Sequence, residues 1–322
     1  MARVEKYGDM NSHAMDIIVR DVLGRAMKYI REHRFDFTVY DKIGPDGAKD
    51  VFTNVDRSAQ EIYVETLRAC FPLCGIIAEE DGVMIRSTHA HHDLYFSIDP
   101  LDGTKAFIRK QSHGIGSMIS LSDGDDVIAA YVGDVMTGEI YGFHGASGVL
   151  RYTEDEECVE LFINEQRSLN DQHLLLDDSP DDSAVLIRQM AKGAERGGLF
   201  KTYEIGSGGI GLVMARLWKG EIGGVILHAG HDTPWDINPV VGISKQMGFR
   251  FFRILHDDSI FWESMWSLRT TMERHYETLD IHKNRWPEFV RWCGHLPRAT
   301  RTTFDPRVAG SGIGNPSDMI VT

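Results

Sequence analysis

The chain has 322 residues and a formal charge of −14, from 34 Lys and Arg against 48 Asp and Glu. This acidity argues against nucleic acid or an anionic membrane as a general partner, because both would repel the long-range field of the protein. Hydrophobic residues make up 42% and charged residues 25% of the sequence, which excludes an intrinsically disordered chain. The length predicts about two domains or one large layered unit.

No segment of the sequence predicts export or membrane insertion. The longest stretch without Asp, Glu, Lys or Arg runs from Gln111 to Ser122 and is shorter than the roughly 18 residues of a membrane span. The first residues lack the apolar block of a signal peptide. The four cysteines form no CxxC pair and are too few for a disulfide framework, so buried thiols are expected. We therefore expect a cytoplasmic protein.

The first half of the chain predicts two helices followed by a sheet. Apolar residues recur at intervals of three and four over Asn11–Arg34 and over about Asp56–Cys70, which is the spacing of an amphipathic helix. Short apolar runs separated by Gly and Asp then predict strands. These runs are Leu73–Ala78, Leu94–Ile98, Gly114–Leu121, Val127–Val132 and Glu139–Phe143. Helices followed by a sheet indicate an α+β fold.

Two acidic, turn-rich stretches mark the boundary between an N-terminal α+β half at 1–150 and a C-terminal α/β half at 151–322. These stretches, Glu154–Glu157 and Asp177–Asp182, are expected to be solvated surface. The second half predicts helices and strands in alternation. They are a helix at Ala184–Ala194, a strand at Phe200–Ile205, a helix at Ile210–Trp218, a strand at Gly224–Leu227 and a helix from Asp236. Beyond about residue 251, apolar residues from Phe261 to Leu279 have helical spacing, which predicts a helical tail at 251–322.

The most informative segment is Asp99-Pro100-Leu101-Asp102-Gly103-Thr104, which follows an apolar strand. Two carboxylates at the end of a buried strand are costly unless a cation compensates their charge, and hard oxygen ligands suit a divalent cation. Gly103 allows the backbone to approach a ligand closely, and a helix from Thr104 would direct its amides at a phosphate. A surface turn is the alternative interpretation of this segment.

Further acids follow other apolar segments. Glu79 follows a second apolar strand, and Asp56 begins the second helix. Asp236 begins a later helix, which it could cap as well as bind a metal. A surface turn or a helix cap explains each acid alone, whereas a shared metal site explains why several buried strands end in acids.

These motifs resemble those of the magnesium-dependent, lithium-sensitive phosphomonoesterases, which include inositol monophosphatases, fructose bisphosphatases and bisphosphate nucleotidases. Ala78-Glu79-Glu80-Asp81 is similar to the family's G/A-E-E motif, Asp99–Thr104 to its D-P-[LI]-D-G-T motif and Trp235-Asp236 to its W-D motif. Asp56, after Val51-Phe52-Thr53, is similar to the upstream V-T-x-x-D element. The four motifs stand in family order over roughly residues 10 to 250. The resemblance implies an αβαβα sandwich, inhibition by lithium and a homodimer.

The same resemblance implies two or three Mg²⁺ ions per active site. Glu79, Asp99 and the Leu101 carbonyl would hold one ion, Asp99, Asp102 and Asp236 a second, and Glu79 and Asp56 would lie near a third. In the family's mechanism, a water activated by the metal and oriented by Glu79 and the Thr104 hydroxyl attacks phosphorus in line. The catalytic residues implied are Glu79, Thr104 and Asp56.

The substrate-binding residues implied by the resemblance are Gly103, Thr104, Ser207, His228 and Asp236. Two departures bear on the substrate. Inositol monophosphatases carry an acid shortly before W-D that grips the polyol, and His228 takes its place here, with one residue inserted. The family's small residues after W-D are replaced by Ile237-Asn238-Pro239-Val240. We therefore expect a sugar phosphate first, an inositol phosphate second and 3′-phosphoadenosine 5′-phosphate third.

Two rival interpretations remain open. The segment Gly206–Gly211 fits the GxGxxG fingerprint of dinucleotide binding, whereas the resemblance makes it a turn that lines the substrate pocket. A catalytically silent regulator of the same fold, binding metal or phosphate, is the alternative to an enzyme, although Glu79 and Thr104 are intact. The partner expected is a small phosphorylated metabolite, with neither nucleic acid nor a membrane.

Overall fold

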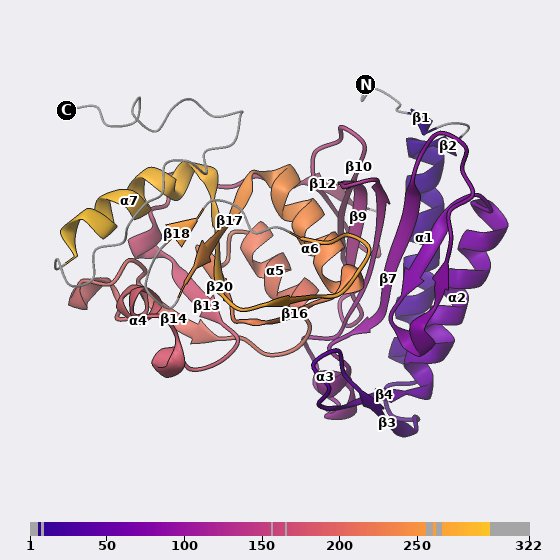
Figure 1. Ribbon diagram of the computed structural model, residues 1–322, viewed down its shortest axis with the longest axis horizontal. Coiled ribbons are helices and arrows are strands. Elements are labelled where there is room, and N and C mark those ends of the chain that lie inside the picture. The colour runs from indigo at the N-terminus through magenta and orange to yellow at the C-terminus, as the bar shows by residue number, and fades with distance from the viewer. Residues whose placement is uncertain are drawn as a thin grey trace.

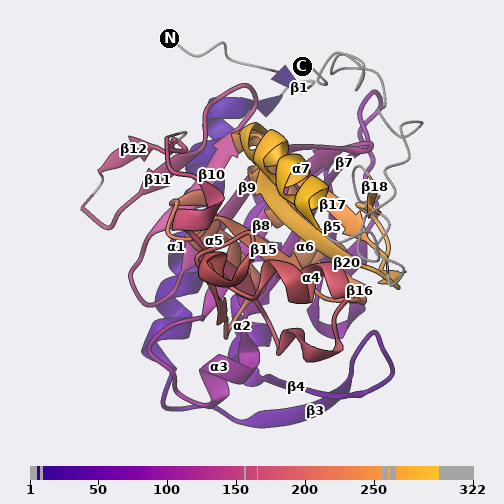
Figure 2. The same ribbon diagram turned by 90° about the vertical axis from the view of Figure 1, so that its left-hand side faces the viewer.

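Five layers of alternating helix and sheet make up the structure, as Figure 1 shows from the side and Figure 2 from one end. Helices α1 and α2 form the first layer, α5 and α6 the middle layer, and α4 and α7 the last layer. The helices are α1 (Ser12–Glu32), α2 (Asn54–Cys70), α3 (Thr104–Ile108), α4 (Val185–Met190), α5 (Ile210–Trp218), α6 (Pro234–Met247) and α7 (Trp286–His295). The computed structural model describes residues 6–7, 10–155, 157–164, 166–255, 260–261 and 266–296. The predicted αβαβα layering is confirmed.

The first sheet has eight strands and is antiparallel except for the pairing of β5 with β7. In spatial order its strands are β12 (Cys158–Glu160), β11 (Leu150–Tyr152), β10 (Ile140–His144), β9 (Asp126–Asp134), β8 (Gly116–Asp123), β7 (Leu94–Asp102), β5 (Gly75–Ala78) and β6 (Met84–Ile85). Each strand that the apolar runs predict in the first half is present. The sheet continues past the proposed boundary at residue 150, because β11 and β12 pair at its edge.

The second sheet has six strands, of which β14, β13 and β15 run parallel. In spatial order its strands are β14 (Thr202–Ile205), β13 (His173–Leu176), β15 (Gly224–Leu227), β20 (Glu277–His282), β17 (Phe249–Ile254) and β18 (Ile260–Phe261). Three two-stranded pairs complete the described strands. They are β1 (Lys6–Tyr7) with β2 (Met10–Asn11), β3 (Val39–Ile43) with β4 (Lys49–Thr53), and β16 (Gly230–Asp232) with β19 (Met272–Arg274).

Strand alternation explains why one sheet can be covered on both faces. On β8, Ile119 and Leu121 face the core beneath α1 and α2, whereas Met118 faces the core shared with α5 and α6. On β20, Leu279 and Ile281 face α4 and α7. Because successive side chains point to opposite faces, each strand contributes to two cores.

Side-chain caps begin the first two helices where the sequence places them. The Asn11 carboxamide accepts hydrogen bonds from the amides of His13 and Ala14 at the start of α1. At α2, Thr53 and Asp56 form a reciprocal capping box, in which the Thr53 amide donates to Asp56 at 2.9 Å. The cap therefore fixes the position of Asp56 without the help of a bound ligand.

The prediction of a helical tail from about residue 251 is wrong for most of its described part. That part holds β17, β18, β19 and β20 before α7 begins at Trp286. The spacing between Phe261 and Leu279 misled because these apolar residues belong to separate strands: Phe261 lies in β18, Met272 in β19 and Leu279 in β20. Residues 256–259, 262–265 and 297–322 of the predicted tail lie outside the described residues.

Smaller differences concern single segments. The predicted helix at Ala184–Ala194 is shorter, because α4 ends at Met190. All four cysteines are free, but Cys70 and Cys158 are exposed where buried thiols were expected. Among the described residues, no helix is long and apolar enough to cross a bilayer.

Asp280 gives a stability prediction, because this fully buried carboxyl lies in the central strand β20. Burial raises its pKa well above the usual range, and the Ser244 hydroxyl and the Arg250 charge offset this only in part. Above the unfolded-state pKa of roughly 4, the unfolded chain ionises while the folded chain retains its proton, so stability falls by up to ~1.4 kcal/mol per pH unit.

We expect Asp280→Asn to remove this loss. The free energy of unfolding of the variant, relative to that of wild type, should then be about 2 kcal/mol higher at pH 7.5 than at pH 5. Urea unfolding at the two pH values measures the gain. Asp36→Asn, at an exposed position, is the matched control and should change neither value. An equal effect of Asp280→Asn at both pH values would contradict the assignment.

Candidate metal centre and active site

Three carboxylates from two elements, β7 and α6, converge between the two sheets. Asp99 and Asp102 lie at the end of β7, and Asp236 lies in the first turn of α6. One oxygen from each lies within 4.8 Å of the others, and both Asp99 and Asp102 are buried. The structure therefore brings together three of the predicted metal ligands.

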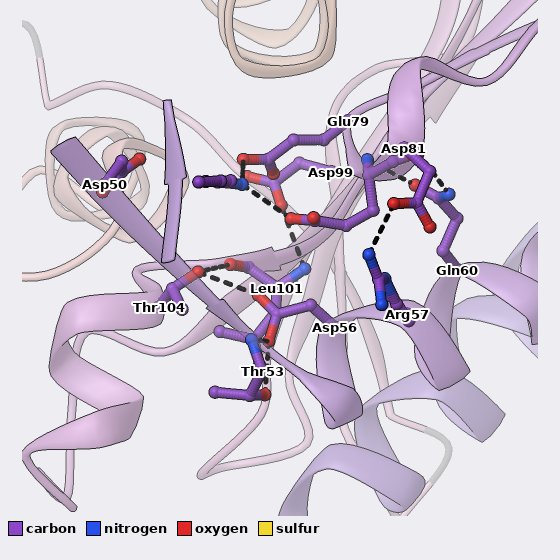
Figure 3. A network of polar contacts seen from close by, with 12 residues as sticks. Asp50, Thr53, Asp56, Arg57, Gln60, Glu79, Asp81, Asp99, Leu101 and Thr104 are labelled. Carbon is purple, nitrogen blue, oxygen red and sulfur yellow. Dashed lines mark hydrogen bonds and ion pairs between the residues drawn. The ribbon is translucent and has the colours of Figure 1, made fainter. Parts of the chain in front are cut away.

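The turn after β7 positions Leu101 and Thr104 beside this group. The Asp99 carboxylate accepts a hydrogen bond from the Leu101 amide at 2.9 Å, which closes the turn. The Thr104 hydroxyl lies 3.0 Å from Asp56 Oδ1 and 3.1 Å from the Leu101 carbonyl oxygen (Figure 3). Because Asp56 comes from the first turn of α2, two segments far apart in the sequence meet at the Thr104 hydroxyl.

Glu79 adjoins this group and is paired with a lysine that the sequence analysis missed. Lys42 Nζ, from β3, lies 2.7 Å from Glu79 Oε1 and 2.7 Å from Glu80 Oε1. Gln60 holds the same turn, because its carboxamide exchanges hydrogen bonds with the backbone of Glu80 at 2.8 and 2.9 Å. In Figure 3 the carboxyl group of Glu79 points toward that of Asp99. No sequence motif marks Lys42, since it comes from a hairpin 37 residues earlier.

Asp102 is held by the start of α5 rather than by its own loop. The Ile210 amide donates to Asp102 Oδ1 at 3.0 Å and the Gly211 amide donates to Oδ2 at 2.8 Å. A Cβ on Gly209 would lie 2.2 Å from the Asp102 carboxylate. Gly209 and Gly211 therefore allow the segment to approach Asp102 closely, and because Asp102 occupies the Ile210 and Gly211 amides, these amides are not free for a pyrophosphate.

Gly103 and Ser207 lie where two loops meet. Gly103 has φ +89°, a conformation that favours glycine, and its Cβ would lie 2.2 Å from the Gly114 carbonyl oxygen. Ser207 is exposed in the turn between β14 and α5, and this turn packs against Gly114. The predicted helix after Gly103 is a single short turn, α3.

His228 follows β15, on the second sheet, and forms part of a separate charged group. Its Nδ1 lies 2.8 Å from Glu277 Oε1 and its Nε2 lies 3.1 Å from Asp177 Oδ1. The hydrogen bond to Glu277 raises the pKa of His228. The Asp177–Asp182 stretch was expected to be solvated surface, and the Asp177 side chain is 63% exposed although it also pairs with His228.

The electrostatics of the acidic group favour a bound cation. Burial, followed by repulsion from Glu79 and Asp102, raises the pKa of Asp99 well above its usual range. Burial and the charge of Asp236 raise the pKa of Asp102 to about 8. Burial also raises the pKa values of Asp56, Glu79 and Asp236. Carboxylates this close repel one another unless positive charge compensates them, and hard oxygen donors suit Mg²⁺.

The chain is similar to known proteins in both sequence and fold. Residues 11–277 match the model of the inositol monophosphatase family. The chain belongs to the inositol monophosphatase family. Among curated proteins, the Nus factor SuhB of Escherichia coli strain K12 is 32% identical over 96 residues, which cover 30% of this chain and 34% of that protein. The alignment therefore spans about a third of the length of such relatives.

Solved structures of inositol monophosphatases (IMPases) share the fold. The IMPase of Thermotoga maritima superposes with a TM-score of 0.65 at 18% identity, over 87% of this chain and 96% of that one. An IMPase/NADP phosphatase structure with Mg²⁺ and phosphate superposes with a TM-score of 0.65 at 16% identity, over 88% of this chain and 96% of that one. At this identity the likeness establishes the fold of this family member, and the site residues carry the chemistry.

Proposed function

We propose that this inositol monophosphatase family member is a Mg²⁺-dependent phosphatase that hydrolyses a small phosphate monoester. The observation that supports this most is the convergence of Asp99, Asp102 and Asp236 within 4.8 Å. Glu79 and the Leu101 carbonyl, at the same place, would complete the ligands for two or three ions. The Mg²⁺ complex of the IMPase/NADP phosphatase supports the choice of metal.

The proposed roles of the chain's own residues follow from their hydrogen bonds. Bound Mg²⁺ would activate a water and neutralise charge on the substrate phosphate, which is the main requirement of phosphate ester hydrolysis. Asp56 can accept the Thr104 hydroxyl hydrogen, which leaves the Thr104 oxygen as an acceptor for the attacking water. Glu79 would accept from the same water, and Lys42 fixes its carboxylate. A contact between Gly103 and the phosphate is proposed on the resemblance to the family alone.

For the substrate we propose a sugar phosphate, with an inositol phosphate or a 3′(2′),5′-bisphosphate nucleotide as alternatives. Ser207, His228 and Asp236 would contact the leaving group. A cytoplasmic homodimer is proposed on the resemblance to the family alone.

The names of curated relatives favour a second candidate function. The curated relatives that match part of the chain are named Nus factors, so a non-catalytic regulator with a metal- or phosphate-binding site is the alternative. The intact set of Asp56, Glu79 and Thr104 argues for the enzyme.

Phosphate release from a panel of phosphorylated metabolites, with Mg²⁺ and with a chelator, tests the proposal. We expect Mg²⁺-dependent turnover of at least one sugar or polyol phosphate, and inhibition by millimolar lithium. Calorimetry with Mg²⁺ alone is the control for an intact site. Mg²⁺ binding without release from any substrate would favour the regulator.

A further inference from the structure

The carboxyl ends of three parallel strands meet at one edge of the second sheet. Asp177 follows β13, Gly206 follows β14 and His228 follows β15, and the strands are paired in register. In open sheets, ligands bind in the crevice outside the carboxyl ends of parallel strands. This edge is thus a natural place for the part of a substrate that extends beyond its phosphate.

The same edge adjoins the acidic group on both sides. On one side, the Gly206 amide donates to the Leu176 carbonyl at 2.6 Å, and the turn that follows leads to the α5 amides that hold Asp102. On the other side, β16 leads from His228 into the turn of α6 that carries Asp236. The segments that leave this edge after β14 and β15 therefore lead to the α5 amides that hold Asp102 and to Asp236 itself.

Asp177 is oriented by a buried pair. Glu277 is 4% exposed, and its carboxylate accepts from the Ala184 amide at 2.8 Å as well as pairing with His228 Nδ1. Glu277 accepts a hydrogen bond from His228 Nδ1 and so favours the doubly protonated ring, whose Nε2 forms an ion pair with Asp177 Oδ1 at 3.1 Å. The Asp177 side chain remains 63% exposed, so it can accept further hydrogen bonds.

A residue of the C-terminal segment supports this arrangement through hydrogen bonds. Arg274, on β19, donates to the His228 carbonyl oxygen at 2.7 Å and to the Thr278 hydroxyl at 3.0 Å. Its Nε lies 3.3 Å from Asp232 on β16, the partner strand of β19. Arg274 therefore fixes the main chain at His228 and the β16 strand that leads to Asp236.

We propose that Asp177, positioned by His228 and Glu277, binds hydroxyl groups of the leaving alcohol and so selects polyhydroxylated phosphate esters. This inference rests on the proposed phosphatase function. A carboxylate held on one oxygen offers its remaining lone pairs to neighbouring hydroxyl donors, which an aryl leaving group lacks. The acid that sequence reasoning sought shortly before Trp235 is thus supplied by another strand.

The test compares kcat and KM for myo-inositol 1-phosphate, glucose 6-phosphate and p-nitrophenyl phosphate, all with Mg²⁺. For Asp177→Ala we expect the preference for the polyol esters over the aryl ester, as a ratio of kcat/KM, to fall about 10- to 100-fold, mainly through KM. A fall of this size corresponds to the loss of one hydrogen bond to a charged group. Asp182→Asn, at an exposed position in the same loop, should leave the ratio unchanged.

A second variant separates positioning from folding. Glu277→Gln can still accept from the Ala184 amide but loses its charge beside His228, so we expect a smaller fall in the same ratio, again in KM. A ratio within twofold of wild type for Asp177→Ala would overturn the inference while leaving the phosphatase function intact. If wild type binds Mg²⁺ but cleaves none of the three esters, the proposed function fails and this inference fails with it.

Discussion

Asp99→Asn is expected to lower Mg²⁺-dependent phosphate release by at least about 10²- to 10³-fold while the chain stays folded. The amide oxygen of Asn can still accept the hydrogen bond from the Leu101 amide, so the turn is preserved. The substitution removes one charge from the group formed with Asp102 and Asp236. The effect should therefore come from loss of the cation site rather than from loss of the fold.

Thermal melting gives Asp99→Asn a readout that does not depend on activity. Without metal the variant should be more stable than wild type, because a buried carboxyl with a raised pKa is removed. With Mg²⁺ at ten times its Kd, wild type should gain about 1.4 kcal/mol and the variant little. Asp182→Asn is the exposed control. Equal stabilisation of Asp99→Asn and wild type by Mg²⁺ would contradict the proposed ligand role.

Gly209→Ala is expected to have an effect of similar size without changing any charge. Gly209 has φ −72°, which alanine adopts readily, so backbone strain plays no part. The added methyl would lie 2.2 Å from the Asp102 carboxylate and must displace it from the Ile210 amide. Since a displacement of about 1 Å in an active site can cost 10²-fold in rate, we expect at least that loss of turnover and weaker Mg²⁺ binding.

Gly24→Ala is the matched control for Gly209→Ala. Gly24 lies in α1, and a Cβ at this position would meet no atom within 4 Å. In a helix this change should stabilise the chain by up to about 1 kcal/mol and leave turnover unaltered. Turnover of Gly209→Ala within threefold of wild type would show that the α5 amides do not set the position of Asp102.

Much of the fold could be predicted from local patterns. The helices predicted over Asn11–Arg34 and about Asp56–Cys70 are present as α1 and α2, because each has the three-and-four spacing of one apolar face. The strands of the first half were evident because turn residues separate them. The tail was predicted wrongly because its apolar residues belong to separate strands, and pairing with β15 and β17, far along the chain, decides the conformation of β20.

For the site, the sequence by itself determined which side chains stand at the ends of buried strands: Glu79 after β5, Asp99 and Asp102 at the end of β7. Carboxylates at the end of a buried strand need a compensating positive charge, and this requirement can be inferred from each strand separately. Local chemistry therefore predicted a site for a divalent cation, whereas magnesium was implied by the resemblance to the family, whose model the chain matches.

Only the tertiary structure decided what surrounds those ligands. Lys42 reaches Glu79 from a hairpin 37 residues earlier, and the α5 amides reach Asp102 from 108 residues later. Asp177 lies at the surface, as its acidic stretch predicted, and the parallel pairing of β13 with β15 places it beside His228. Such contacts depend on which strands pair and which helix ends approach, and no local spacing encodes them. The physical reason is that the partners of each charged side chain come from segments far apart in the sequence, and only folding brings those segments together.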